Sequence, residues 1–327
     1  MNRRVWLLVV AASLLCGLFT TYEHVIACSM AYFAPGAEQQ RLYLALLDGS
    51  AGSPLQYRVL PAGLEWLFVR ASGAAGLPNH FAVAVIALRA LGDTTAFVLA
   101  WAYFRKLGLS LPNAFIGISL LAWGMSYSHH NTDLRFDSYL DLVFYLGAAL
   151  CLLHGRAPWV LPLMLLAALN RETSGLIPFL VLAHAGAGGP IPRRAFALAA
   201  GALAIWLAVF AGLRWAFPPQ RLIVPEGVTG LGWPMLAYNA GRLLTPIQLF
   251  AVLGFVPLLA LAGWRHWPPV LRAFAWALVP AWLVIHAFAA VVAEARLFLV
   301  PQALVFVPGA LFLAQASGGA ASRSRPE

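Results

Sequence analysis

Continuous apolar stretches constrain this chain more than any other feature of its sequence. They cover residues 5–22, 81–104, 112–128, 138–154, 158–169, 174–185, 195–216, 247–264, 271–292 and 297–315. A helix that crosses the hydrocarbon core of a bilayer needs about 20 mostly apolar residues, and most of these stretches approach that length. The sequence therefore predicts an all-α, polytopic transmembrane protein with about ten membrane helices.

The composition excludes a water-soluble globular protein. Of the 327 residues, 61% are hydrophobic and only 10% are charged, whereas a soluble domain carries about 25% charged residues. The apolar stretches use most of the chain, so we expect one membrane domain over residues 1–327. Within it, residues 23–80 form the longest connection, and residues 316–327 form a short tail.

The basic residues predict the orientation. The formal charge of +9 comes almost entirely from Arg, because Lys106 is the only lysine. Arg and Lys collect on the cytoplasmic side of membrane spans, which predicts that both termini are cytoplasmic and that residues 23–80 lie outside. Eleven of the twelve acidic residues then lie outside or within the membrane. With Arg assigned to the ends of spans, the bilayer is the expected partner, and nucleic acid is not.

A polar interruption divides the stretch between residues 158 and 185. Asn170, Arg171, Glu172 and Thr173 follow one another there. The stretch is either one long helix or two short ones, and the distribution of Arg favours the break. Each short helix is about 18 Å long at 1.5 Å per residue, so the pair either crosses the bilayer or dips into it. Polar residues at that depth require protein or a water-filled cavity beside them.

The long 23–80 connection is expected to contain interfacial helices. Residues 37–47 and 55–69 mix aromatic and aliphatic side chains with Glu, Gln and Arg, which is typical of amphipathic helices that lie in the membrane interface. The connection also carries Glu23, Glu38 and Asp48. Each is either a surface acid or a base that deprotonates a substrate hydroxyl at the outer face.

Two further charged groups have different interpretations. Arg89 and Asp93 lie four residues apart in the second apolar stretch, so they share a helix face and form a structural pair. The second outer connection, residues 126–138, is richer in polar side chains. It contains the candidate metal ligands His129, His130 and Asp133, and also Arg135 and Asp137. These side chains suit a divalent metal or a phosphate, or they are simply a solvated loop.

Arginine is the residue type that best binds a phosphate headgroup, because its planar fork donates two hydrogen bonds to phosphate oxygens. The Arg residues expected on the outer side are Arg41, Arg58, Arg135, Arg171, Arg214, Arg221, Arg242 and Arg296. The chain has no GxxxxGK[ST] nucleotide-binding loop, no HExxH motif and no GxSxG motif. Their absence argues against a P-loop ATPase, a zinc hydrolase and a serine hydrolase of these types, and leaves a divalent metal open.

Four short segments occur in the same order in a family of bacterial GT-C-like membrane proteins. They are QYRVLP at residues 56–61, FD at 136–137, LNRET at 169–173 and EARLFLVP at 294–301. Together with the first span and the long helical outer loop, these segments make the chain resemble the GT-C class of integral membrane glycosyltransferases. The resemblance extends over residues 5–315.

The resemblance implies inverting transfer of a sugar from a polyprenyl-phosphate donor at the outer face of a bacterial inner membrane. It implies Glu38 as the catalytic base, although Glu stands where the family usually has Asp, and Glu23 is the alternative. The implied substrate-binding residues are Tyr57, Arg58, Arg135, Asp137, Asn170, Arg171, Glu172 and Arg296. The competing interpretations are a non-catalytic subunit of the same fold and a flippase for the same lipid, although the sequence shows no duplicated half of the kind common in transporters.

Overall fold

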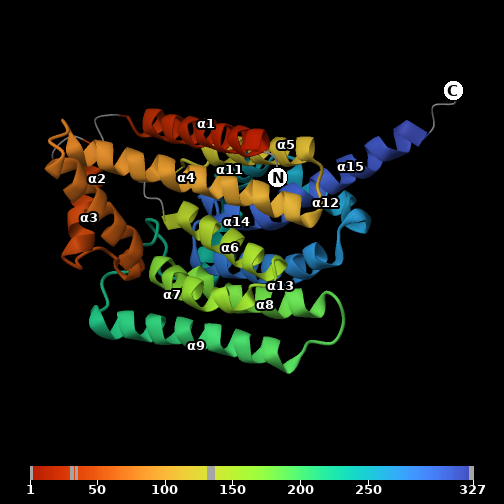
Figure 1. The fold of residues 1–327 in the computed structure, drawn as a ribbon. Coiled ribbons are helices and arrows are strands. Elements are labelled where there is room, and N and C mark those ends of the chain that lie inside the picture. Colours follow the sequence, from red (N-terminus) through yellow and green to blue (C-terminus); the bar gives the residue numbers. More distant parts are fainter. Residues whose placement is uncertain (1–2, 30–32, 34–35, 131–136, 324–327) are drawn as a thin grey trace.

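The computed structural model describes residues 3–29, 33, 36–130 and 137–323, with side chains as far as residue 317. The described residues fold into a bundle of roughly aligned helices (Figure 1). The long helices are α1 (Arg3–Cys28), α4 (His80–Leu107), α5 (Leu111–Ser126), α6 (Asp137–Leu153), α9 (Arg193–Ala216), α13 (Pro269–Ala289) and α15 (Val307–Arg323). The shorter ones are α2 (Glu38–Leu47), α3 (Val59–Ala74), α7 (Val160–Asn170), α8 (Ile177–Gly186), α10 (Trp233–Gly241), α11 (Leu244–Leu253), α12 (Val256–Ala262) and α14 (Leu299–Pro301).

Every predicted apolar stretch contains helix, but fewer helices than predicted have the length of a membrane span. Five are long and apolar enough to cross a bilayer, or six if α11 and α12, bent by 67° at their junction, count as one broken span. Helices of this length and composition indicate a membrane protein. The α5 helix and residues 157–170 are apolar but shorter, so ten complete spans remain a prediction.

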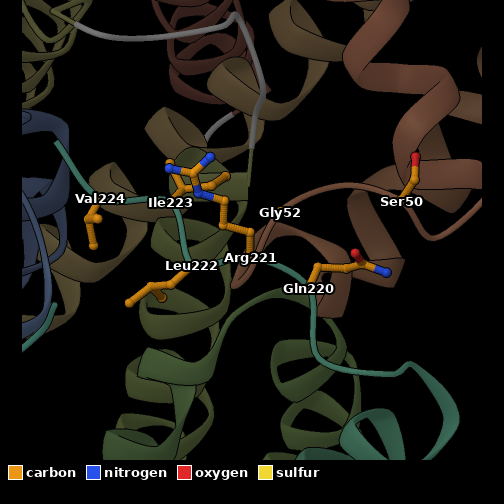
Figure 2. Close-up of a pocket in the computed structure, with 7 residues that line it drawn as sticks. All are labelled: Ser50, Gly52, Gln220, Arg221, Leu222, Ile223 and Val224. Carbon is orange, nitrogen blue, oxygen red and sulfur yellow. The ribbon is translucent and has the colours of Figure 1, made fainter. Parts of the chain in front are cut away.

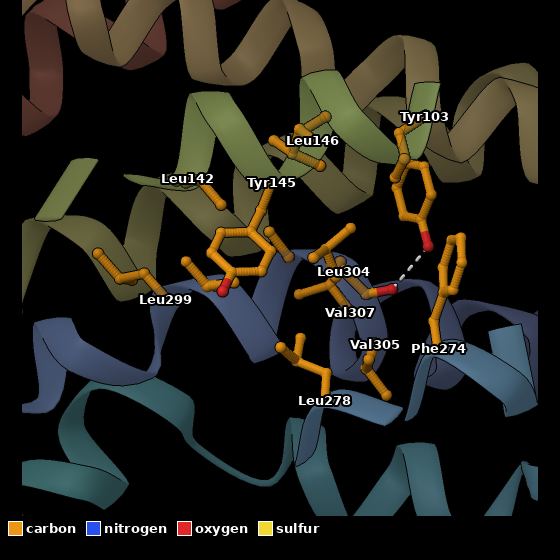
Figure 3. Close-up of a cluster of buried hydrophobic side chains, with 14 of the residues drawn as sticks. Tyr103, Leu142, Tyr145, Leu146, Phe274, Leu278, Leu299, Leu304, Val305 and Val307 are labelled. Carbon is orange, nitrogen blue, oxygen red and sulfur yellow. Dashed lines mark hydrogen bonds between the residues drawn. The ribbon is translucent and has the colours of Figure 1, made fainter. Parts of the chain in front are cut away.

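The centre of the bundle is the segment that leads into α15. Leu299, Leu304 and Val305 are buried there against α6 and α13 (Figure 3). Pro308 has no backbone N–H, so it cannot make the helical bond to the carbonyl of Leu304. The Tyr103 hydroxyl donates to that carbonyl instead, at 2.8 Å. A π-helical turn over Gln302–Phe306 accompanies this local change.

Gly17 lets α1 approach α4 closely. A Cβ added at Gly17 would lie 2.3 Å from the Thr94 hydroxyl and 2.9 Å from the Thr94 backbone nitrogen. Only glycine therefore permits this spacing, which is typical of helix pairs in membranes. The α1 helix continues to Cys28, so Glu23 lies on the helix and not, as expected, at the start of the outer connection.

The helices predicted in the outer connection are present. They are α2, the 3₁₀ turn η2 (Leu55–Tyr57) and α3, which runs a few residues beyond the predicted end. Together α2 and α3 occupy one end of the bundle (Figure 1). The α3 helix also packs against α4 and α7. It therefore brings Arg58, the residue before its first turn, to the bundle rather than leaving it in the interface.

The predicted break between residues 170 and 175 is confirmed. After α7 the backbone of Arg171 is extended, with φ −154° and ψ 151°, and the 3₁₀ helix η4 (Glu172–Leu176) leads into α8. Pro158 and His184 line one cavity, so α7 and α8 run as an antiparallel hairpin. Trp206 of α9 donates to the Glu172 carbonyl at 3.1 Å, and α9 continues to Ala216. Trp206 lies ten residues before the end of α9, so the polar turn is set back from that end by about 15 Å at 1.5 Å per residue.

The α10 helix was not predicted, because its nine residues form no long apolar run. It is held against the end of α13 by Asn239. The Asn239 amide nitrogen donates to the carbonyls of Ala287 and Ala290 at 3.0 and 2.9 Å, and its oxygen accepts from the Val292 N–H at 2.9 Å. Asn239 thereby fixes the chain just before Glu294 and Arg296.

Candidate functional site

A cavity of about 380 Å³ lies at the α2–α3 end of the bundle. It is lined by three arginines from distant parts of the chain, Arg58, Arg171 and Arg296. Its carboxylates are Asp137 and Glu294. Met235, Ile223 and Val224 contribute apolar surface. The cavity therefore combines a cationic wall with an apolar one, the arrangement expected of a site for an amphiphilic anion.

The first half of the cationic wall is built around Asp137. An Arg58 Nη1 donates to Asp137 Oδ2 at 2.6 Å, and the Arg171 Nε lies 3.9 Å from the same oxygen. Asp137 is in the first turn of α6, where the helix dipole stabilises a carboxylate. Arg171 reaches this position because the break after α7 turns its backbone out of helix.

Arg171 is buried, with 7% of its side chain exposed. One of its Nη groups donates to Ser138 Oγ at 2.8 Å. Its Nε makes no hydrogen bond to the described residues. A buried donor without a hydrogen-bond partner costs about 1–3 kcal/mol, and the carboxylate nearest to this Nε is that of Asp137, 3.9 Å away.

The second half of the wall comes from the chain after α13. Arg296 donates to Glu294 Oε2 at 2.8 Å, and both side chains are mostly buried. The 3₁₀ helix η6 (Ala295–Phe298) that carries Arg296 is fixed by Trp282, whose indole N–H donates to the Leu297 carbonyl at 2.8 Å. Tyr238 of α10 also lines the cavity and accepts a hydrogen bond from Arg242.

Glu172 and Arg214 form further charged contacts next to Arg58. Glu172 Oε2 lies 3.9 Å from the Arg58 Nε, and Glu172 Oε1 lies 3.9 Å from an Arg214 Nη. The Arg214 guanidinium in turn sits over the Tyr57 ring, 4.4 Å from its centroid. These contacts hold the Arg58 and Glu172 side chains in place without occupying the cavity.

The turn after α7 is anchored by its neighbours. The Asn170 amide donates to the Asp137 carbonyl at 3.0 Å. Thr173 donates to Asp141 Oδ2 at 2.7 Å, and the Tyr145 hydroxyl donates to the Thr173 carbonyl at 2.5 Å. We expected the polar turn to have either protein or a cavity beside it, and it has both.

An extended segment, residues 220–225, crosses between this cavity and a second hollow. Ser53 donates its N–H to the Arg221 carbonyl at 3.0 Å, and the Ile223 N–H donates to the Ser53 carbonyl at 2.9 Å. The second hollow, about 370 Å³, is lined by Ser50, Gly52 and residues 220–224 (Figure 2). Ile223 and Val224 line both spaces, so this segment forms their common wall.

Most of the residues implied as substrate-binding come together here. Arg58, Asp137, Arg171 and Arg296 line the cavity, while Tyr57, Asn170 and Glu172 support those side chains. Arg135 and Asp133 lie outside the described residues. Tyr238 was missed, and no sequence signal marks it, because its position depends on the unpredicted α10.

The two acids implied as the base are placed differently. Glu38 is exposed on α2 and pairs with Arg41 at 2.9 Å, and it does not line the cavity. Glu23 is half-buried on α1 and does not line it either. Of the acids in the described part of the chain, Asp137 and Glu294 line it.

Of the three candidate metal ligands, the structure describes His129 and His130, and these two belong to no metal-binding cluster of described residues. His129 is exposed, and its ring centroid lies 6.1 Å from that of His24. Burial lowers the pKa of His130, and the nearby Arg242 lowers it further. Among the described residues, no group of three or more His, Cys, Asp or Glu side chains could hold a metal. A divalent metal at residues 129–133 thus stays a prediction.

Each of the four segments that carry the family resemblance contributes to this one cavity. Arg58 belongs to the first, Asp137 to the second, Arg171 to the third, and Glu294 with Arg296 to the fourth. Residues 58 and 296 are far apart in the sequence, so their meeting is a property of the fold. No family model matches the chain, and neither a curated protein nor a solved structure matches it significantly.

Proposed function

We propose that this protein is a membrane glycosyltransferase that takes a sugar from a polyprenyl-phosphate donor at the outer face of a bacterial inner membrane. The observation that carries the proposal is the convergence of Arg58, Arg171 and Arg296 on one cavity. Among the described residues, the carboxylates of Asp137 and Glu294 line the same cavity. A phosphate would accept hydrogen bonds from the guanidinium groups that line the cavity.

In this reaction a hydroxyl of the acceptor attacks the anomeric carbon, and the bond from that carbon to the phosphate oxygen breaks. The leaving phosphate gains negative charge, which the arginines stabilise. The hydroxyl proton passes to a carboxylate within hydrogen-bond reach. Glu294 is the better placed acceptor, because it pairs with the Arg296 guanidinium, whereas Asp137 lies beside two guanidinium groups. Glu38 would need a movement of α2 to reach the cavity.

A second function has one observation in its favour. Both carboxylates of the cavity are paired with arginine, an arrangement that suits binding more than proton transfer. A lipid-binding subunit or a flippase would use the same cavity to hold the headgroup without breaking a bond. Binding and transfer must therefore be measured separately.

The binding experiment uses the purified protein in lipid nanodiscs and a radiolabelled polyprenyl-phosphate sugar. Arg171→Gln should weaken binding about 10- to 100-fold, which corresponds to about 1.5–3 kcal/mol for a hydrogen bond to a charged group. Arg41→Gln is the matched control, because Arg41 is exposed at the same end of the bundle and does not line the cavity. Equal binding by both variants would remove the cavity from the proposal.

The transfer experiment compares Glu294→Gln with Glu38→Gln. If Glu294 is the base, its variant should keep donor binding while turnover falls about 10²-fold or more, and Glu38→Gln should remain active. The reverse result would restore Glu38 as the base. Binding without transfer or hydrolysis by the unaltered protein would favour the non-catalytic function.

A further inference from the structure

A larger cavity lies at the other end of the molecule, away from α2 and α3. Its volume is about 670 Å³, within the range of about 300–1,000 Å³ typical of small-molecule sites. It is bounded by the turn between α6 and α7, the end of α8 and the beginning of α9. Figure 1 shows these connections at the end of the bundle toward which the C-terminal helix extends.

The cavity is apolar in its depth and cationic at its rim. Leu152, Val181 and Leu198 form apolar walls, and Val181 is buried. Arg194 lines the cavity and is exposed, whereas His184 is half-buried. A long basic side chain placed in this way keeps its charged head at the water boundary while its stem covers apolar surface.

The charge around the cavity has one sign. Arg193 precedes Arg194 at the start of α9, and Arg156 lies in the neighbouring α6–α7 turn. Within the part of the chain that the structure describes, no acidic residue lines the cavity. The described acids belong to the opposite half of the bundle or, like Asp93, to the middle of α4. An occupant of this cavity therefore meets positive charge that no described carboxylate offsets.

We propose that this cavity binds an anionic phospholipid from the leaflet on that side of the membrane. The lipid phosphate is held by Arg194, and one acyl chain lies against Leu152, Val181 and Leu198. A basic pocket between helices at a membrane boundary is the arrangement that binds acidic lipid headgroups. This site is separate from the arginine cavity at the α2–α3 end and does not depend on glycosyl transfer.

The experiment measures lipid binding by the full-length protein in a zwitterionic detergent. Dioleoyl phosphatidylglycerol is titrated in, bound lipid is counted by native mass spectrometry, and thermal unfolding is followed in parallel. Arg194→Gln should weaken binding about tenfold. Arg193→Gln is the matched control, because it removes the same charge from the adjacent position, which does not line the cavity. It should retain nearly full binding.

A second variant tests the cavity itself. A Cβ added at Gly188 would meet no atom within 4 Å, so Gly188→Phe can place its ring in the cavity without a backbone clash. It should also abolish tight binding. Equal losses in the two Arg variants would show diffuse attraction instead of a site. Equal affinity for phosphatidylcholine, or protection by glycerol phosphate alone, would likewise overturn the proposal.

Discussion

Two buried arginine–aspartate pairs in this protein have opposite surroundings. In α4, the Arg89 Nε lies 3.3 Å from Asp93 Oδ2, and both side chains are almost fully buried. At the cavity, an Arg58 Nη1 lies 2.6 Å from Asp137 Oδ2, with 12% of the Arg58 side chain exposed. The first pair joins residues of one helix, and the second joins residues 79 positions apart.

The Arg89 pair is surrounded by protein side chains, although Asp93 Oδ1 makes no hydrogen bond to the described residues. Thr20 of α1 donates to Asp93 Oδ2 at 3.0 Å. The Arg89 guanidinium lies 3.8 Å from the centroid of the Tyr139 ring and also contacts His24. His24 Nε2 in turn bonds the Met125 carbonyl at 2.7 Å. Neither Arg89 nor Asp93 lines the arginine cavity.

Burial of charge therefore does not by itself mark a functional site in a membrane protein. The Arg89 network uses its charges to fasten α1, α4 and α6 to one another. The Arg58 site instead brings side chains from four segments to the wall of a cavity. Access to a cavity distinguishes the binding region from the fastening region, and the two regions should respond differently to mutation.

The largest expected effect is the loss of Asp93. Asp93→Ala leaves Arg89 buried without its carboxylate, which should destabilise the fold by about 3–5 kcal/mol. Thermal unfolding in detergent measures this loss. The double variant Arg89→Met with Asp93→Ala should recover much of it, because no uncompensated charge remains. A single variant as stable as the parent would show that the pair does not fasten the helices.

The next effect concerns the spacing of α1 and α4. Gly17→Ala forces a methyl group against the Thr94 backbone, and such overpacking costs about 1–3 kcal/mol. Gly92→Ala is the matched control on α4, because a Cβ there meets no atom within 4 Å. It should be neutral or slightly stabilising. A smaller loss for Gly17→Ala than for Gly92→Ala would contradict the close approach.

The elements of the fold were largely predictable, because apolar runs report helices directly. The break at Arg171 was predictable as well, since four polar residues interrupt an apolar stretch. The Arg89–Asp93 pair followed from its spacing of four residues. The number of complete spans was not predictable in the same way, because short apolar helices such as α7 and α8 can return without crossing.

The site was predictable in its residue types and only partly in its assembly. Arg58, Asp137 and Arg171 stood in distinct motifs, but no pattern in the sequence shows that they share a cavity. Convergence depends on tertiary packing of α3 against α7 and of α10 against α13. Glu38 illustrates the same limit, because this carboxylate lies in the expected connection but pairs with Arg41 and does not line the cavity.

At the cavity, the corresponding mutation should destabilise the fold less than Asp93→Ala does, and it should also weaken binding. Arg58→Ala removes one partner of Asp137, but Arg171 remains beside the same carboxylate and water can enter the space. We expect a loss of about 1–2 kcal/mol in unfolding free energy, the net contribution of one hydrogen bond, because the Arg171 guanidinium still offsets the buried Asp137 charge. Donor binding should still fall at least tenfold. A stability loss as large as that of Asp93→Ala would make this pair structural too.

The smallest effect is a pH dependence at His130. Its pKa in the folded protein is lowered by burial and by Arg242, His129 and Arg296. Above about pH 6.5 the ring is neutral in both the folded and unfolded chains and contributes nothing. As the pH falls through 6.5 the unfolded chain takes the proton first, so stability is lost until the folded pKa is passed. Because the ring is partly exposed, solvent screening keeps this loss below about 0.5 kcal/mol.

His130→Asn should match the unaltered protein in thermal stability at pH 7.5 and lose less stability at pH 5. A phosphate-bearing ligand in the cavity should narrow that difference, because its negative charge beside Arg296 offsets the repulsion and raises the pKa of His130. The ligand should still narrow this stability difference when Asp93→Asn is added, because Asp93 belongs to the Arg89 network and does not line the cavity. It should no longer do so when Arg171→Gln is added. If the ligand narrows the difference equally in Arg171→Gln, the anion is bound elsewhere, and the arginine cavity is no more a ligand site than the Arg89 network.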